Sequence, residues 1–270
     1  MMNYKTNLAA SLVAGLFTVG QAGAAVYTED FSSFGTVGSQ LAPGGGWTVN
    51  EALGGSTEPG PMTFVSSLGS TTYGKSGAIG GAMDEPPASA TTIVLSHAAA
   101  TNVDVLGFSV DFAIAGDIDY PERDDFAFSF LDSSGDNVFT IGFENLGDTS
   151  TKFLVSYTVG SGTEMSLLDD LGQEMYIDID GLYSLSFQFE ANGSDPTFTG
   201  SLGVGAFATS FSGTATGIGG EDIADFAAVW DIEGGGGNHL IFDNVVVIPE
   251  PASMLMLGLS GIALMRRRRR

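Results

Sequence analysis

Apolar and polar residues alternate with a period of two along most of the chain between residues 26 and 247. This alternation is typical of β-strands that bury one face. In the clearest run, Phe108, Val110, Phe112 and Ile114 share one face, and small or polar residues occupy the other. Similar runs predict further strands at 126–130, 139–143, 153–159, 183–189, 226–232 and 239–247.

Turn-forming residues separate these runs. The segment 132–137 reads Asp-Ser-Ser-Gly-Asp-Asn and predicts a hairpin connection between two of the strands. No segment of the body has a long 3.6-residue period, and 164–172 and 221–226 each fit a single helical turn at most. We therefore predict an all-β body that folds as a two-sheet antiparallel sandwich, in one domain spanning residues 25–247.

The first 24 residues differ from this body and resemble a leader. Lys5 supplies a positive charge, Leu8–Val19 forms an apolar stretch, and Ala22 and Ala24 give the small-x-small spacing that signal peptidase cleaves. The order of these features predicts a signal peptide with a helical core and a mature chain that begins at Ala25. The Sec machinery and signal peptidase are the expected partners of such a leader.

The other end of the chain has a three-part pattern. Pro249, Glu250 and Pro251 interrupt regular structure, and residues 252–265 are apolar. As a helix, this apolar run would be about 21 Å long, shorter than the hydrocarbon core of about 30 Å. The chain then ends in Arg266, Arg267, Arg268, Arg269 and Arg270. Because arginines stay on the cytoplasmic side, the body is expected outside the inner membrane, in agreement with the leader.

A Pro-Glu-Pro element, a short transmembrane helix and a terminal arginine cluster, in this order over residues 248–270, resemble the PEP-CTERM sorting signal. The resemblance implies recognition by an exosortase, a membrane cysteine transpeptidase that cuts near the Pro-Glu-Pro element. It also implies transient residence in the inner membrane of a Gram-negative bacterium. The final location would be the cell surface or the extracellular space of a cell that makes exopolysaccharide or biofilm.

Charge and cysteine content exclude several classes of function. Residues 26–249 contain 31 acidic residues and only three basic ones, Lys75, Arg123 and Lys152, which gives a formal charge of −28. Such a body repels nucleic acid and attracts cations, although a solvated acidic surface also keeps an exported protein soluble. The chain has no cysteine, so disulfides, thiolate nucleophiles and cysteine-bound metal clusters are excluded.

The two ends of the body carry a second resemblance. Glu29-Asp30-Phe31 near the start, Gly46-Trp47 and a closing Phe242-Asp243-Asn244-Val245 resemble jelly rolls of the concanavalin A-like and carbohydrate-binding-module kind. The resemblance implies that the first and last strands pair. It also implies a structural Ca²⁺ in some members, which here points to Glu29, Asp30 and Asp243.

The strand phase leaves two alternatives for Asp243. The residue alternates with Ile241 and Val245, so an inward orientation of this face would bury a carboxylate that needs a cation or hydrogen-bond donors. If Leu240 and Phe242 face inward instead, Asp243 is exposed.

Sugar binding is a further possibility, because exposed aromatic rings stack on pyranose faces. The available residues are Trp47, Tyr73, Tyr120, Tyr157 and Trp230. Trp230 and Tyr157 are in phase with apolar neighbours and are predicted in the core. Tyr120 lies in an acidic loop that would bind a cation, contact sugar hydroxyls or simply be solvated. The residues of this candidate ligand loop are Asp117, Asp119, Tyr120, Glu122, Asp124 and Asp125.

Catalysis finds little support in the sequence. His97 and His239 are the only histidines, and neither a nucleophile elbow nor a phosphate-binding glycine loop occurs. We therefore expect no enzymatic activity. The leading hypothesis is an exported, non-enzymatic protein of the surface or the biofilm matrix, sorted by an exosortase. The alternative is a carbohydrate-binding module for exopolysaccharide, with or without calcium.

Overall fold

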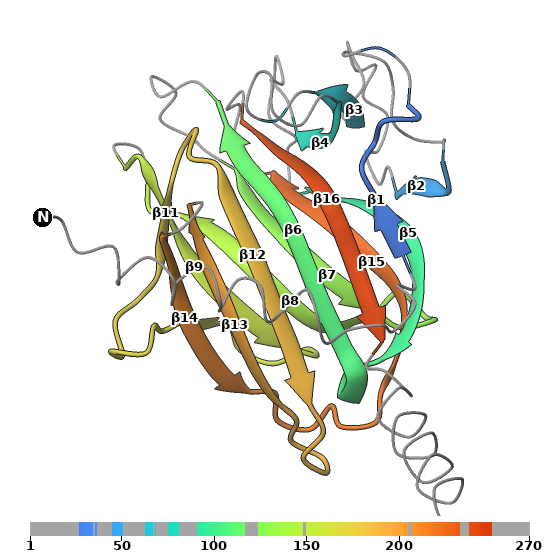
Figure 1. The fold of residues 1–270 in the computed structure, drawn as a ribbon, viewed down its shortest axis with the longest axis vertical. Helices are drawn as coiled ribbons and strands as arrows, with labels where there is room; N and C mark the ends of the chain where they lie inside the picture. Colours follow the sequence, from blue (N-terminus) through green and yellow to red (C-terminus); the bar gives the residue numbers. More distant parts are fainter. Residues whose placement is uncertain are drawn as a thin grey trace, which may run out of the picture.

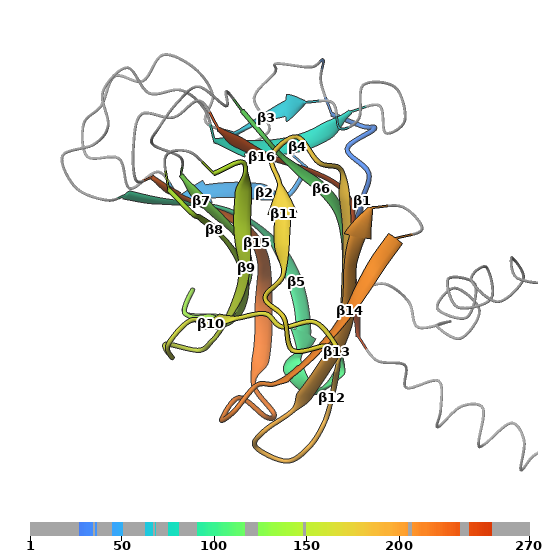
Figure 2. The ribbon, with the colours of Figure 1, turned by 90° about the vertical axis from the view of Figure 1, so that its left-hand side faces the viewer.

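The computed structural model confirms a sandwich of two antiparallel sheets that face each other (Figure 2). Within the part of the chain described below, each sheet has eight strands. The predicted leader helix and the short hydrophobic helix of the tail lie outside it. The structure describes residues 27–34, 36, 45–50, 63–66, 68, 75–80, 91–116, 124–147, 150–204, 207–232 and 238–249.

The first sheet, here called sheet A, faces the viewer in Figure 1. Its strands follow the order β14 (Phe207–Thr214), β13 (Thr197–Val204), β12 (Tyr183–Glu190), β6 (Leu106–Ala115), β16 (His239–Pro249), β4 (Ser76–Gly80) and β3 (Thr63–Ser66), and β1 (Tyr27–Glu29) also pairs with β16. Tyr27 lies opposite Val247 in this pairing. The first and last strands of the body are therefore neighbours, as the jelly-roll resemblance implied.

The second sheet, sheet B, lies behind sheet A in this view. Its strands follow the order β10 (Met165–Ser166), β9 (Lys152–Val159), β8 (Asn137–Asn145), β7 (Asp125–Leu131), β15 (Asp222–Ile232), β5 (Thr91–Asn102) and β2 (Trp47–Asn50), and β11 (Tyr176–Asp178) also pairs with β9. A short 3₁₀ turn, η1 (Val103–Val105), connects β5 to β6.

The two predicted helical turns are wrong. Residues 165–166 form β10, and residues 222–226 begin β15. Because β15 pairs with β5 on one side and with β7 on the other, its backbone groups are satisfied by long-range partners. This tertiary pairing outweighs a weak local preference.

Aromatic side chains fill the space between the sheets. Trp47 and Trp230 are both buried, and Phe128 is inaccessible to solvent at the centre. The ring of Phe128 lies 5.5–6.0 Å, between centroids, from the rings of Phe108, Phe112, Phe143, Phe226 and Phe242. The predicted inward faces of the strands at 108–114 and 126–130 are thus confirmed.

A β-bulge reverses the alternation of β16. Asn244 has a φ of +50°, and the register against β6 shifts between Asp243 and Val246. Phe242 before the bulge and Val245 after it both reach the main core. The sequence left Asp243 either facing inward and buried or facing outward and exposed. In the structure it shares the outer face of the sheet with Ile241, and yet its side chain is only 1% exposed.

Candidate functional site

Asp243 is held in a small polar cluster on the outer face of sheet A. Its Oδ2 accepts a hydrogen bond from Ser76 Oγ at 3.2 Å, and its Oδ1 accepts one from the Asn244 N–H at 2.7 Å. Burial, with a smaller effect from the charges of Asp30 and Asp111, raises the pKa of Asp243 to about 6. The two hydrogen bonds act in the opposite direction, so the side chain is stabilised here by donors from the protein.

The predicted calcium ligands are only partly brought together. Asp30 approaches Asp243, but Glu29 Oε1 accepts the Phe31 N–H at 2.8 Å and Asp30 Oδ1 accepts the Ser32 N–H at 3.0 Å. The hydrogen bonds from Ser32 also lower the pKa of Asp30. No three acidic or histidine side chains form a metal-binding group among the described residues. The arrangement favours a hydrogen-bonded cap at the end of β1, and the calcium site stays a prediction.

Two residues of the candidate ligand loop bond within the protein. Asp124 is fully buried, and its Oδ2 accepts the Trp230 Nε1–H at 2.8 Å. Asp125 Oδ1 accepts the Asn145 N–H at 2.6 Å. Both carboxylates therefore anchor the start of β7. The remaining loop residues, Asp117, Asp119, Tyr120 and Glu122, lie outside the described residues, as does Tyr73.

A pair of carboxyl groups on the outer face of sheet B was not anticipated from the sequence. Burial, a hydrogen bond with Glu164 and the charges of Glu164 and Asp125 together raise the pKa of Glu144 to about 7. Ser156 Oγ also donates to Glu164 Oε1. Gly142 leaves room for this group, because a Cβ there would lie 3.0 Å from Glu164 Oε1 and 2.6 Å from Ser156 Oγ.

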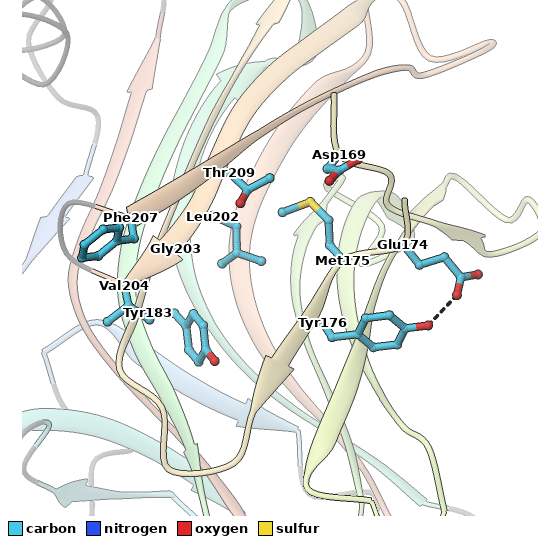
Figure 3. Close-up of a pocket in the computed structure, with 10 residues that line it drawn as sticks. All are labelled: Asp169, Glu174, Met175, Tyr176, Tyr183, Leu202, Gly203, Val204, Phe207 and Thr209. Atoms are coloured by element: carbon cyan, nitrogen blue, oxygen red, sulfur yellow. Dashed lines mark hydrogen bonds between the residues drawn. The ribbon is translucent and has the colours of Figure 1, made fainter. Parts of the chain in front are cut away.

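A pocket of about 250 Å³ opens where the two sheets part at one edge (Figure 3). Leu202 and Val204 of β13 and Phe207 of β14 form one wall, and Met175 and Tyr176 belong to the other. Val204 and Phe207 have the same strand phase as the buried Leu202, so their side chains lie on the inner face of sheet A. Sheet B does not cover this part of the inner face, and the pocket forms there. Its lining residues are Asp169, Glu174, Met175, Tyr176, Tyr183, Leu202, Gly203, Val204, Phe207 and Thr209.

Aromatic side chains are unusually accessible at this pocket. Phe207 is 87% exposed and Tyr176 is 42% exposed. The Tyr176 hydroxyl donates to Glu174 Oε2 at 2.5 Å, which raises the pKa of Tyr176 and fixes its ring beside the carboxylate (Figure 3). Ser166 Oγ donates to the other oxygen of Glu174 at 3.1 Å. An apolar ring and an oriented carboxylate thus lie on opposite walls.

Hydrogen bonds also hold the rest of the pocket. Asp169 Oδ1 accepts the N–H groups of Leu171 and Gln173, both at 2.8 Å, and so closes the turn that carries Glu174. The Asp178 N–H donates to the hydroxyl oxygen of Tyr183 at 2.7 Å. The site is therefore fixed before any ligand arrives, which lowers the entropic cost of binding.

The aromatic residues expected to bind sugar are not the ones that form this pocket. Trp47 and Trp230 are buried, and Tyr157 packs against Phe139 and Phe198 at ring distances of 6.2 and 5.1 Å. The core position predicted for Trp230 is confirmed, and Tyr157 is partly buried where it packs against the core. Alternation alone places Phe207 on the same strand face as the buried Phe211, so sequence gave no sign that its ring is exposed.

Comparison with family models decides the nature of the tail. Residues 247–270 match the family model described as the PEP-CTERM protein-sorting motif. The chain carries a PEP-CTERM sorting motif. The motif includes Pro249, Glu250, Pro251 and the terminal arginines, and it implies exosortase processing and passage across the membrane in Gram-negative bacteria.

The PEP-CTERM motif begins inside the folded sheet. Val247, Ile248 and Pro249 belong to β16 and lie opposite Phe108, Gly107 and Leu106 of β6. The described residues include no helix long and apolar enough to cross a membrane, and the apolar segment 252–265 lies beyond them. The predicted signal cleavage site at Ala22, Ala24 and Ala25 also lies outside the described residues.

One solved structure with a similar arrangement places the body of this chain among known sandwich folds. The CBM2 module of the evolved Dit protein from Lactobacillus casei BL23 phage J-1 is similar with a TM-score of 0.52 and 15% identity, over 83% of this chain and 94% of that one. This likeness shows a shared fold.

Two further structures give lower TM-scores. The conserved carbohydrate esterase of Shiga toxin-encoding bacteriophage phi24B gives 0.47 with 18% identity, over 85% of this chain and 100% of that one. The lectin UEA-II, solved with galactose, gives 0.45 with 11% identity, over 80% and 97% of the two chains. No curated protein matches the chain.

Proposed function

We propose that this PEP-CTERM protein is a non-enzymatic protein of the cell surface or extracellular matrix and that its sandwich binds a polysaccharide in the pocket between the sheets. The observation that carries the proposal is the exposure of two aromatic rings in one pocket, Phe207 on one wall and Tyr176 next to the carboxylate of Glu174 on the other. Aromatic rings stack on the apolar faces of sugars, and carboxylates accept hydrogen bonds from sugar hydroxyls.

Location and fold support this reading. The sorting motif directs the chain out of the cytoplasm. Exopolysaccharide is the expected partner outside the cell. The phage J-1 module that shares the fold is described as a CBM2 module, which is a carbohydrate-binding type. The shared fold is compatible with this function, and the residues of the pocket supply the chemistry for it.

The Glu144–Glu164 pair does not have the spacing that a glycosidase needs. Glycosidases separate their two catalytic carboxyl groups by about 5 Å or more, so that the scissile bond fits between them. Glu144 and Glu164 are instead linked by a hydrogen bond, which leaves no space for a sugar ring between them. They lie on the outer face of sheet B and do not line the pocket.

Affinity electrophoresis of the mature protein in gels that contain exopolysaccharide from a floc-forming bacterium tests the proposal. We expect retardation of the wild type and its loss in Phe207→Ala and in Tyr176→Ala. Leu146→Ala is the matched control, because Leu146 is 47% exposed and does not line the pocket. Equal migration of all four proteins with and without polysaccharide, across several polysaccharide classes, contradicts the proposal.

A further inference from the structure

The pocket contains negative charge without a basic partner. Among its described lining residues, Asp169 and Glu174 are the acidic ones, and none is lysine or arginine. The hydrogen bonds to these carboxylates come from backbone N–H groups and from the hydroxyls of Ser166 and Tyr176. These donors are neutral, so they orient the carboxylates without cancelling their charge.

The rest of the body does not supply the missing positive charge. Lys75 donates its Nζ hydrogens to the backbone oxygens of Ser32 and Phe34, at 3.3 and 2.5 Å, next to β4. Arg123 lies outside the described residues, and Lys152 begins β9 without lining the pocket. With 31 acidic residues in the body, an anionic polysaccharide meets like charge on approach and again at the site.

We infer that the pocket takes a glycan with free amino groups, a polymer of 2-amino-2-deoxy sugars that is at least partly unacetylated. The inference rests on the proposed function of the same pocket. The apolar face of one sugar ring lies on Phe207 at one end of the pocket, and the ammonium group of another sugar along the polymer pairs with Glu174 or Asp169 on the opposite wall. An ammonium donates charge-assisted hydrogen bonds to carboxylates, which are stronger than those from an acetamide or hydroxyl.

Calorimetric titration of the mature protein with three hexasaccharides tests the inference. The probes are a glucosamine, an N-acetylglucosamine and a galacturonic acid hexamer, which differ in charge. We expect binding of the glucosamine hexamer that is about tenfold tighter than that of its acetylated form, weakening as salt rises, and no binding of the uronate. Phe207→Ala should abolish binding, and Glu174→Gln should remove the preference for the free amine.

Glu190→Gln is the charge-matched control, because Glu190 lies at the far end of β12 from Tyr183 and does not line the pocket. Melting curves of each variant establish that the sandwich is intact. Equal affinity for the acetylated and free-amine hexamers, with loss in Phe207→Ala, overturns the inference and leaves the proposed function standing. If Phe207→Ala and Glu174→Gln both bind the glucosamine hexamer as tightly as the wild type does, the binding is general charge attraction and the inference is overturned. No binding of any hexamer or polysaccharide removes both.

Discussion

The carboxyl group of Glu144 on β8 forms a hydrogen bond with that of Glu164, which precedes β10 by one residue. Two carboxyl groups bond in this way only while one of them keeps a proton. The pair therefore adds a proton-dependent hydrogen bond between the segment that leads into β10 and strand β8 of sheet B. This link makes the stability of the edge dependent on pH.

Stability should fall as pH rises through neutrality. The folded protein holds a proton on Glu144 up to about pH 7, whereas the unfolded chain releases it near pH 4.3. The stabilisation is thus complete below about pH 4 and is lost as the pH approaches and passes 7. Thermal melts between pH 4.5 and 8, followed by circular dichroism, should show a declining midpoint, and Glu144→Gln should flatten the upper part of this decline. A slope unchanged in Glu144→Gln would falsify this assignment.

Asp243 also makes the stability of the folded protein fall as the pH rises, but over a lower pH range than Glu144 does. Its pKa is about 6 in the folded protein and about 3.9 in an unfolded chain, so the stabilisation from its proton is complete below about pH 4 and is lost as the pH rises through 6. Asp243→Asn should remove this part of the pH dependence, because an amide keeps an acceptor for the Asn244 N–H. Asp243→Ala leaves the Asn244 N–H and Ser76 without their partner and should cost about 1–3 kcal/mol in the free energy of unfolding. Urea denaturation of both variants measures the difference.

Calcium dependence is tested most directly by calorimetry. If Ca²⁺ binds Asp243 together with Asp30 or Glu29, a millimolar excess of calcium should raise the melting midpoint and EDTA should lower it. Asp243→Asn should abolish the response, and Asp169→Asn, at the distant pocket, should preserve it. Identical midpoints in calcium and in EDTA rule out a structural calcium.

The central and exposed phenylalanines should differ sharply in their effect on folding. Phe128→Ala removes a ring that contacts five others and should cost about 3–5 kcal/mol. Phe207→Ala should change stability by about 0.5 kcal/mol at most, because the ring is 87% exposed. Chemical denaturation of the two variants provides the comparison, and a large loss in Phe207→Ala would show that the pocket wall is part of the core.

Strand positions were predictable because alternation is a local property. The runs that begin at Phe108, Phe126 and Tyr183 each became strands with the expected inward face. The phase of the last strand was not predictable, since the bulge at Asn244 depends on a positive φ and on pairing with two neighbours. The sorting motif, in contrast, was evident from the sequence because its three parts follow one another in one continuous segment.

The pocket could not have been found from alternation. Phe207 and Phe211 have the same phase on β14, and only the packing of sheet B over one and not the other separates an exposed ring from a buried one. The Glu144–Glu164 pair likewise depends on how the chain between β9 and β10 folds back over Gly142. Both features arise from the relative placement of elements far apart along the chain, which a single sequence does not reveal.

The position of β16 has a consequence for the timing of folding during export. This last strand lies between β6 on one side and β1 and β4 on the other, so three strands from the first half of the chain have β16 as a pairing partner. A chain that crosses a membrane from its N-terminus delivers β16 last of the strands, together with the start of the sorting motif. Sheet A therefore gains the strand that joins β6 to β1 and β4 only near the end of translocation.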